Sequence, residues 1–190
     1  QGLQEEGITA SSFPTITYTY PTNSPETANE VTTEIQMWKT VLGITIASTA
    51  ISQNTMYTLE TQTTGKNGPL QMWAGGWGAD YPDPQDWITL QFGDNQPYNE
   101  FNFGNNNGST AAQQRDLQKQ MDAADVISDP NTRAQTYNKI EQQLVDYVAW
   151  LPIYQRPEQY MLKPYVVGFK ENSQAQIPPN DWGNIYITSH

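Results

Sequence analysis

The chain is organised around residues 75–87, which read Gly75-Gly76-Trp77-Gly78-Ala79-Asp80-Tyr81-Pro82-Asp83-Pro84-Gln85-Asp86-Trp87. The small residues in this segment allow a ligand to approach the backbone closely. Asp83 precedes a proline, and this pair predicts that Asp83 caps a helix beginning at Pro84. Asp80 has no comparable local role, and it follows a predicted strand, where ligand sites of α/β sheets gather. Asp80 is therefore the strongest candidate for a ligand contact. The alternative is that Asp80 is a turn residue whose side chain binds the backbone of residues 81–83.

Upstream of this segment, the sequence predicts three strands separated by two helices. The strands are expected at residues 15–20, 44–51 and 70–77, which are rich in β-forming and apolar side chains. Helices are expected at residues 28–42, where apolar side chains recur at helical spacing, and at residues 54–63. Strands that alternate with helices are typical of βαβ units. We therefore expect the three strands side by side in one largely parallel sheet, with the first helix covering one face.

Downstream, the alternation of strands and helices gives way to a long loop and a pair of helices. A helix is predicted at residues 84–92, and residues 94–109 form a loop rich in asparagine and glycine. Apolar stripes at residues 117–127 and 137–148 predict an αα-hairpin that lies on the sheet. Short strands are predicted at residues 151–155, 159–162 and 185–187. The predicted fold class is α/β, with a mixed sheet covered by helices.

The composition argues against several classes of function. A net charge of −11 disfavours a nucleic-acid surface, which needs clustered lysine and arginine. The chain has no cysteine, and its one histidine is the terminal His190, so a Ser-His-Asp triad or a histidine-rich metal site is nearly excluded. No apolar run approaches the ~18 residues of a membrane span, and no Gly-rich phosphate loop precedes a helix. We expect no metal, no cofactor and no nucleic-acid partner.

Four segments carry motifs in a characteristic order. The central one is Trp77-Gly78-Ala79-Asp80-Tyr81-Pro82-Asp83-Pro84. The others are Ser128-Asp129-Pro130-Asn131-Thr132-Arg133, Trp150-Leu151-Pro152-Ile153-Tyr154 and Tyr165-Val166-Val167-Gly168-Phe169. Together they resemble the family 5 extracellular solute-binding proteins, the oligopeptide, dipeptide and nickel type receptors of ABC importers. Receptors of this family are far longer than 190 residues, so the chain resembles their C-terminal lobe.

The resemblance implies a fold, a role and a location. The fold is a lobe of the periplasmic-binding-protein type II kind, with residues 1–168 as the α/β solute-binding lobe and residues 169–190 as a tail that returns toward the other lobe. The role is not enzymatic: it is capture of a small solute, a peptide first of all, between this lobe and a missing N-terminal lobe, for delivery to an ABC permease. The location is extracytoplasmic, in the periplasm or as a cell-surface lipoprotein, with any export signal expected upstream.

Six residues are predicted to bind the ligand. In peptide-binding members of the family, the aspartate of the central motif pairs with the α-amino group of the peptide, and this implies the same role for Asp80. The aromatic side chains of the motif can stack on a ligand or fill the core. Aromatic residues in an otherwise polar loop are better candidates for a cleft, because such a loop has little other reason to display them. The predicted ligand-binding residues are Trp77, Asp80, Tyr81, Tyr98, Phe101 and Phe103.

Two alternative functions stay open at this point. The first keeps the family but replaces the peptide by a carbohydrate, held by tryptophan and tyrosine faces and by asparagine and glutamine amides. The second is a glycoside hydrolase, because Asp80, Asp83 and Asp86 are spaced by three residues and resemble the paired carboxylates of such enzymes.

Overall fold

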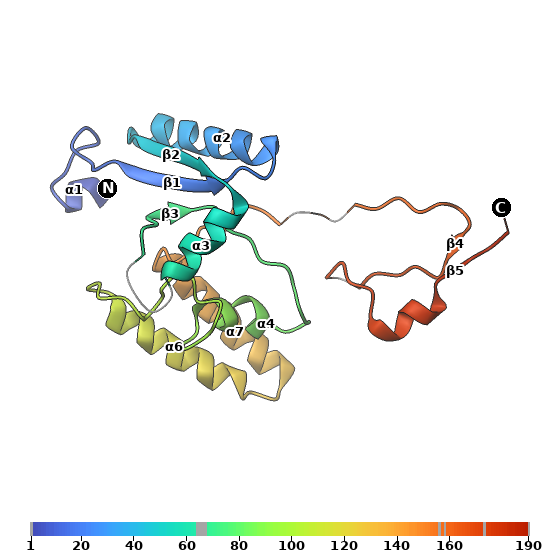
Figure 1. Cartoon of the computed structure of the whole chain (residues 1–190). Helices are drawn as coiled ribbons and strands as arrows, with labels where there is room; N and C mark the ends of the chain where they lie inside the picture. The colour runs from blue at the N-terminus through green and yellow to red at the C-terminus, as the bar shows by residue number, and fades with distance from the viewer. Residues whose placement is uncertain (1, 64–67, 156, 158, 173, 190) are drawn as a thin grey trace.

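The computed structural model describes the whole chain except residues 1, 64–67, 156, 158, 173 and 190. A three-stranded sheet with its helices forms an upper layer, and a second, helical layer lies below it (Figure 1). The chain after residue 150 leaves both layers as an extended C-terminal arm. The short helix α1 (Gly2–Glu5) lies at the N-terminal end.

The sheet is parallel in its described part. Strand β1 (Ile16–Pro21) lies between β2 (Ile46–Ile51) and β3 (Met72–Trp73), and both neighbours pair with it in parallel. The expected α/β class and the expected neighbourhood of the three strands are therefore confirmed. The antiparallel pairing lies in a separate two-stranded sheet, formed by β4 (Val166–Val167) and β5 (Tyr186–Ile187).

Helix α2 (Pro25–Leu42) covers one face of this sheet, as predicted (Figure 1). It begins where the Ser24 side chain accepts a hydrogen bond from the Thr27 backbone at 3.2 Å, and it ends at Gly43, whose φ of 71° suits glycine. Its buried Val31 packs with Tyr18, Ile44 and Ile46, and these four side chains form the core of the upper layer. Burial of the apolar face fixes the helix on the sheet.

Strand β3 is shorter than the predicted 70–77. Helix α3 (Gln53–Thr63) leads toward it, and the last backbone bond to β1 runs from the Ala74 N–H to the Thr19 carbonyl at 3.0 Å. Gly75 and Gly76 follow, and glycine weakens a strand because it has no side chain to pack. The chain therefore leaves the sheet early, and residues 75–83 form a loop.

The lower layer contains four helices of the described chain and has a core of its own. These are α4 (Pro84–Trp87), α5 (Thr89–Phe92), α6 (Ala111–Asp125) and α7 (Pro130–Asp146). The helix predicted at residues 84–92 is thus divided in two, at Ile88. The αα-hairpin is present as α6 and α7, but it packs against α4 and α5 around Phe92 rather than lying on the sheet.

The C-terminal arm contains little regular structure. The predictions of strands at residues 151–155 and 159–162 are wrong for the described residues, because these segments run extended and exposed without a neighbouring strand. The strand predicted at residues 185–187 is confirmed by β5. Its partner strand β4 was not predicted. A short 3₁₀ helix, η1 (Pro179–Asn184), precedes β5.

Candidate ligand-binding site

The loop that follows β3 is closed at its C-terminal end by Asp83. The Asp83 carboxylate accepts a hydrogen bond from the Gln85 backbone at 2.8 Å, which confirms the predicted helix cap. Arg133 on α7 donates to the same carboxylate from Nη2 at 2.7 Å and from Nε at 2.9 Å. The hydrogen bonds from Arg133 hold the pKa of Asp83 below its ordinary value. Asp83 is thus fully engaged in fixing the loop to α7.

Arg133 also joins the ends of the helical hairpin. Its Nη1 donates to the Ala124 carbonyl at 2.5 Å, and its guanidinium lies 5.2 Å from the centre of the Tyr137 ring. Asp125 accepts hydrogen bonds from the Tyr137 hydroxyl and, at 3.1 Å, from Thr89. Burial raises the pKa of Tyr137 above its ordinary value, so this phenol stays protonated and donates. The network gives the loop a rigid base.

The backbone of Asp80 is held by a buried carboxylate. The Asp80 N–H donates to Oδ2 of Asp86 at 2.9 Å, and Asp86 is completely buried. The Asp80 side chain is exposed, and no side chain or backbone group of the described residues donates a hydrogen bond to its carboxylate. The backbone of residue 83 bonds instead to the Tyr81 carbonyl, at 2.9 Å. The structure therefore does not show Asp80 as a turn residue whose side chain binds the backbone of residues 81–83.

Tyr81 lies half-buried beside Asp80. Its hydroxyl donates to the Gln85 side chain at 2.7 Å, and burial, together with nearby carboxylates, raises its pKa. The C-terminal arm returns to this loop, because Gln174 donates to the Tyr81 carbonyl at 3.1 Å and Gln176 donates to the Ala79 carbonyl. The arm therefore pairs two backbone carbonyls that flank Asp80.

Two of the predicted aromatic residues lie together. The Trp77 and Tyr98 rings meet edge to face, with centroids 5.0 Å apart. Tyr98 is 46% exposed, so one side of this pair faces solvent. The buried Trp77 Nε1 has no hydrogen-bond partner among the residues that the structure describes. Trp77, Asp80, Tyr81 and Tyr98 thus come from two loops that meet beyond β3.

Phe101 and Phe103 point elsewhere. Phe101 stacks between Trp73, at 5.7 Å, and Phe92, at 4.8 Å. Phe103 is only 3% exposed and packs edge to face on Phe92, so it has almost no surface for a ligand. Asn99 causes this inward turn, because its side chain binds both the N–H and the carbonyl of Phe103, at 3.0 and 2.8 Å. The expectation of a cleft residue at position 103 is corrected: Phe103 belongs to the core.

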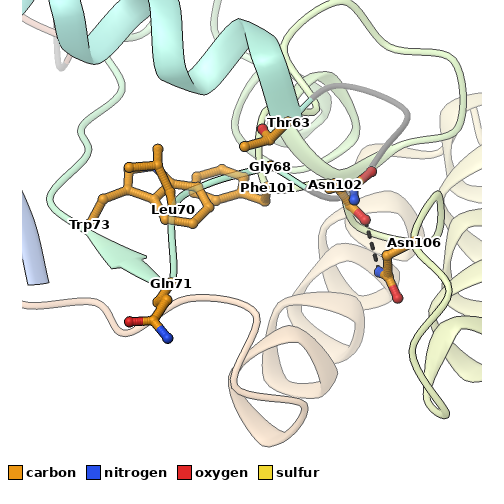
Figure 2. A pocket seen from close by; sticks show the side chains of 8 residues that line it. All are labelled: Thr63, Gly68, Leu70, Gln71, Trp73, Phe101, Asn102 and Asn106. Atoms are coloured by element: carbon orange, nitrogen blue, oxygen red, sulfur yellow. Dashed lines mark hydrogen bonds between the residues drawn. The ribbon is translucent and has the colours of Figure 1, made fainter. Parts of the chain in front are cut away.

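A pocket of about 330 Å³ lies beside Phe101, between the end of α3, the entry to β3 and the loop 94–109 (Figure 2). Of the described residues that line it, only Phe101 was predicted to contact a ligand. The abundance of asparagine in the loop was the available signal for Asn102 and Asn106. The described lining residues are Thr63, Gly68, Leu70, Gln71, Trp73, Phe101, Asn102 and Asn106.

A second pocket, of about 210 Å³, lies between α4 and α7, next to Trp87 and Trp150. No group of three or more potential metal ligands occurs among the described residues. Within the same residues, no helix has the length and apolar character that crossing a bilayer requires.

Comparison with known proteins gives matches at the level of structure. No family model and no curated protein matches the chain. The murein tripeptide binding protein MppA of Escherichia coli matches 99% of the chain with a TM-score of 0.72 and 20% identity. OppA of Burkholderia pseudomallei matches 98% with a TM-score of 0.73 and 18% identity, and Listeria monocytogenes OppA bound to peptide matches 100% with a TM-score of 0.66 and 20% identity.

The matched region is a part of each of those proteins. The chain covers 33% of MppA, 33% of the Burkholderia OppA and 32% of the Listeria OppA. These structures match almost the entire chain, so they confirm the fold that the sequence motifs imply. The chain has the fold of about one third of a peptide-binding receptor of the MppA and OppA kind.

Proposed function

We propose that this chain is one lobe of a receptor that captures a small solute, first of all a peptide, outside the cytoplasm for an ABC importer. The proposal is supported by similar structures that are themselves binding proteins, among them a periplasmic receptor for murein tripeptide and an OppA bound to peptide. The partner lobe, the permease and the location in the periplasm or as a cell-surface lipoprotein are parts of this proposal.

The observation that carries the proposal is the exposure and the hydrogen bonding of Asp80. Its backbone is fixed by the fully buried Asp86, while its own carboxylate is exposed and accepts no hydrogen bond from the described residues. A carboxylate on a fixed backbone is ready to pair with a cationic group, and the free α-amino group of a peptide is such a group. Closure of a second lobe removes water from the pair and strengthens it.

The aromatic pair gives the ligand a second contact. Trp77 lies in the same loop as Asp80 and meets the half-exposed Tyr98 edge to face, and Tyr81 is half-buried next to Asp80. Rigid aromatic surface binds with little loss of conformational entropy and accepts many side chains. The arrangement suits a receptor that holds the backbone end of a peptide firmly and its side chains less selectively.

Catalysis is the less favoured function. Of the three aspartates spaced by three residues, Asp83 is paired with Arg133 and Asp86 is buried against the Asp80 backbone. A hydrolase needs two carboxylates that both reach the substrate, and of these three aspartates only Asp80 is exposed. We therefore propose binding without reaction, and a carbohydrate as the second candidate ligand because aromatic and amide side chains are abundant near the site.

The test of this proposal is calorimetry on the receptor that contains these residues, with one peptide and its N-acetylated form. Acetylation removes the cationic amine and leaves the rest of the ligand unchanged. We expect affinity to fall by about 2–5 kcal/mol, because Asp80 is then left unpaired in a closed site. Equal affinity for both forms removes the amine-binding role and places the carbohydrate alternative first.

A further inference from the structure

A short turn in the C-terminal arm meets the loop that carries Asp80. The side chain of Gln176 donates a hydrogen bond to the Ala79 carbonyl, and that of Gln174 donates to the Tyr81 carbonyl at 3.1 Å. These partners are 97 and 93 residues apart in the sequence. Figure 1 shows the arm turning back toward this loop after it has left both layers. The arm therefore contacts the backbone on both sides of Asp80.

The turn is closed by its own hydrogen bonds. Oδ1 of Asn172 accepts the N–H of Gln174 at 2.9 Å and the N–H of Gln176 at 3.1 Å. The N–H of Asn172 donates to the Gln176 carbonyl at 2.8 Å. The side chains of Gln174 and Gln176 are partly buried, whereas Ala175 between them is exposed. We call Asn172, Gln174, Ala175 and Gln176 the clip, because their local bonds present two glutamines to the loop.

The clip completes the fixation of one peptide unit beside Asp80. The unit between Ala79 and Asp80 has its carbonyl bound by Gln176 and its N–H bound by the buried Asp86, at 2.9 Å. A peptide unit is planar, so hydrogen bonds at both of its ends restrict its rotation. Rotation of this unit would turn the Cα–Cβ bond of Asp80 and, with it, the exposed carboxylate. Gln176 and Asp86 together therefore fix the direction in which Asp80 faces.

Gln174 adds a weaker constraint on the other side of Asp80. The Tyr81 carbonyl already accepts the N–H of Asp83 at 2.9 Å, so Gln174 is its second donor. Both glutamines are neutral, and this suits a carboxylate that is to receive a cation. A lysine or arginine in their place would bring a positive charge next to Asp80 and compete with the ligand. An amide holds the backbone without adding that charge.

We propose that Gln176, supported by Gln174, is a positioning residue for the amine site at Asp80. The clip holds the Asp80 carboxylate in the direction that meets the α-amino group of the peptide. A site that is already ordered loses less entropy when its ligand binds, so the clip strengthens the pair. This inference rests on the proposed function, because it requires an amine at Asp80.

Calorimetry on the receptor that contains these residues tests the inference, with one free peptide and its N-acetylated form. In the double variant Gln174→Met and Gln176→Met, both side chains keep their approximate length but lose the donated hydrogen bond. The variant should bind the free peptide at least about fivefold more weakly than the wild type. It should bind the acetylated peptide within about twofold of the wild type, because that ligand does not use Asp80. A clip that only stabilised the fold would weaken both ligands alike.

A second variant disturbs the same contact by another route. Asn172→Ala removes the acceptor that closes the clip and leaves both glutamines in place, so it should show the same selective loss. It decides the question if the double variant does not fold. Gln135→Met, the same exchange at an exposed position of α7, is the control and should leave both affinities unchanged.

The possible outcomes separate the clip from the amine site itself. The inference is overturned if the wild type prefers the free peptide and both clip variants keep that preference in full. It is also overturned if the clip variants lose affinity for the two forms alike, and in both cases the role of Asp80 stands. Equal binding of the two forms by the wild type would instead remove the amine site, and the inference with it.

Discussion

Asp86 accepts the backbone N–H of Asp80 at 2.9 Å and is itself completely buried. One hydrogen bond therefore spans the Tyr-Pro-Asp-Pro turn and fixes the residue that we propose to hold the ligand. The acceptor is a carboxylate, and hydrogen bonds to charged groups are stronger than those between neutral groups. The loop owes its shape to this bond and to the cap at Asp83.

The first prediction concerns this bond. Asp86→Ala should make the Asp80 amide exchange with solvent at least about tenfold faster, because a hydrogen bond to a charged group contributes about 1.5–3 kcal/mol. Hydrogen-exchange NMR measures the effect. Asp94→Ala, a change at an exposed aspartate outside the loop, is the control and should leave that amide unchanged. Unaltered exchange in Asp86→Ala would show that the loop is held by something else.

A second prediction concerns the pair formed by Asp83 and Arg133. Its two side chains are 33% and 14% exposed, and two short hydrogen bonds join them. A double-mutant cycle with Asp83→Asn and Arg133→Met should give a coupling of about 1–3 kcal/mol in the free energy of unfolding, a range that allows for partial solvent screening.

The same cycle on Asp116 and Lys119 is the control. That pair has an N–O distance of 2.7 Å as well, but its side chains are 69% and 74% exposed. Its coupling should be much smaller than that of Asp83 and Arg133, because water and salt screen charges on the surface. Equal couplings for the two pairs would contradict the structural role of Arg133. Because the pKa of Asp83 is lowered, its contribution should be present above its ordinary pKa and disappear as the pH falls through the lowered one.

Much of the local structure was predictable because it depends on neighbouring residues. The caps at Ser24, Gly43 and Asp83 follow from side-chain chemistry within one helical turn, and the structure has all three. The βαβ order follows from the spacing of apolar residues, because that spacing reflects the local periodicity of each strand or helix.

The remaining features depend on contacts between distant segments. Phe103 was expected in a cleft because its loop is polar, but the side chain of Asn99 turns it into the core. Arg133 reaches Asp83 from fifty residues away in the sequence, and no local rule predicts this pairing. The strands expected at residues 151–155 and 159–162 required neighbouring strands, and propensity alone does not supply them.

A third prediction concerns pH and Glu60. Burial, and the nearby Glu100 carboxylate, raise the pKa of Glu60 to about 7 from its ordinary value of 4.5. The folded protein therefore binds a proton more tightly than the unfolded chain. Stability from this group is present below pH 4.5 and is lost as the pH rises to about 7. Glu60→Gln should remove this loss and make the protein more stable than the wild type at pH 8.

Chemical denaturation between pH 4 and 8 measures the difference between the two proteins. Glu141→Gln, at an exposed position on α7, is the control and should keep the pH dependence of the wild type. The account of Glu60 is wrong if Glu60→Gln retains the same decrease in stability between these pH values.

The fourth prediction concerns the C-terminal arm. Its exposed apolar residues include Leu151, Tyr160, Met161 and Trp182, so it buries little surface against the rest of the chain. In the 190-residue chain alone, amides after residue 150 should exchange faster than those of β1 and β2. Slow exchange throughout the arm would mean that it packs stably without a partner lobe.

The central claim is that Asp80 pairs with the α-amino group of a peptide. Its most direct test is calorimetry of wild-type and Asp80→Asn receptor, each with one peptide and its N-acetylated form. Acetylation should cost the wild type about 2–5 kcal/mol and should cost the variant less than about 1 kcal/mol, because the variant has already lost the charge that meets the amine. An equal loss on acetylation in both proteins would contradict the claim, since the amine would then be recognised elsewhere.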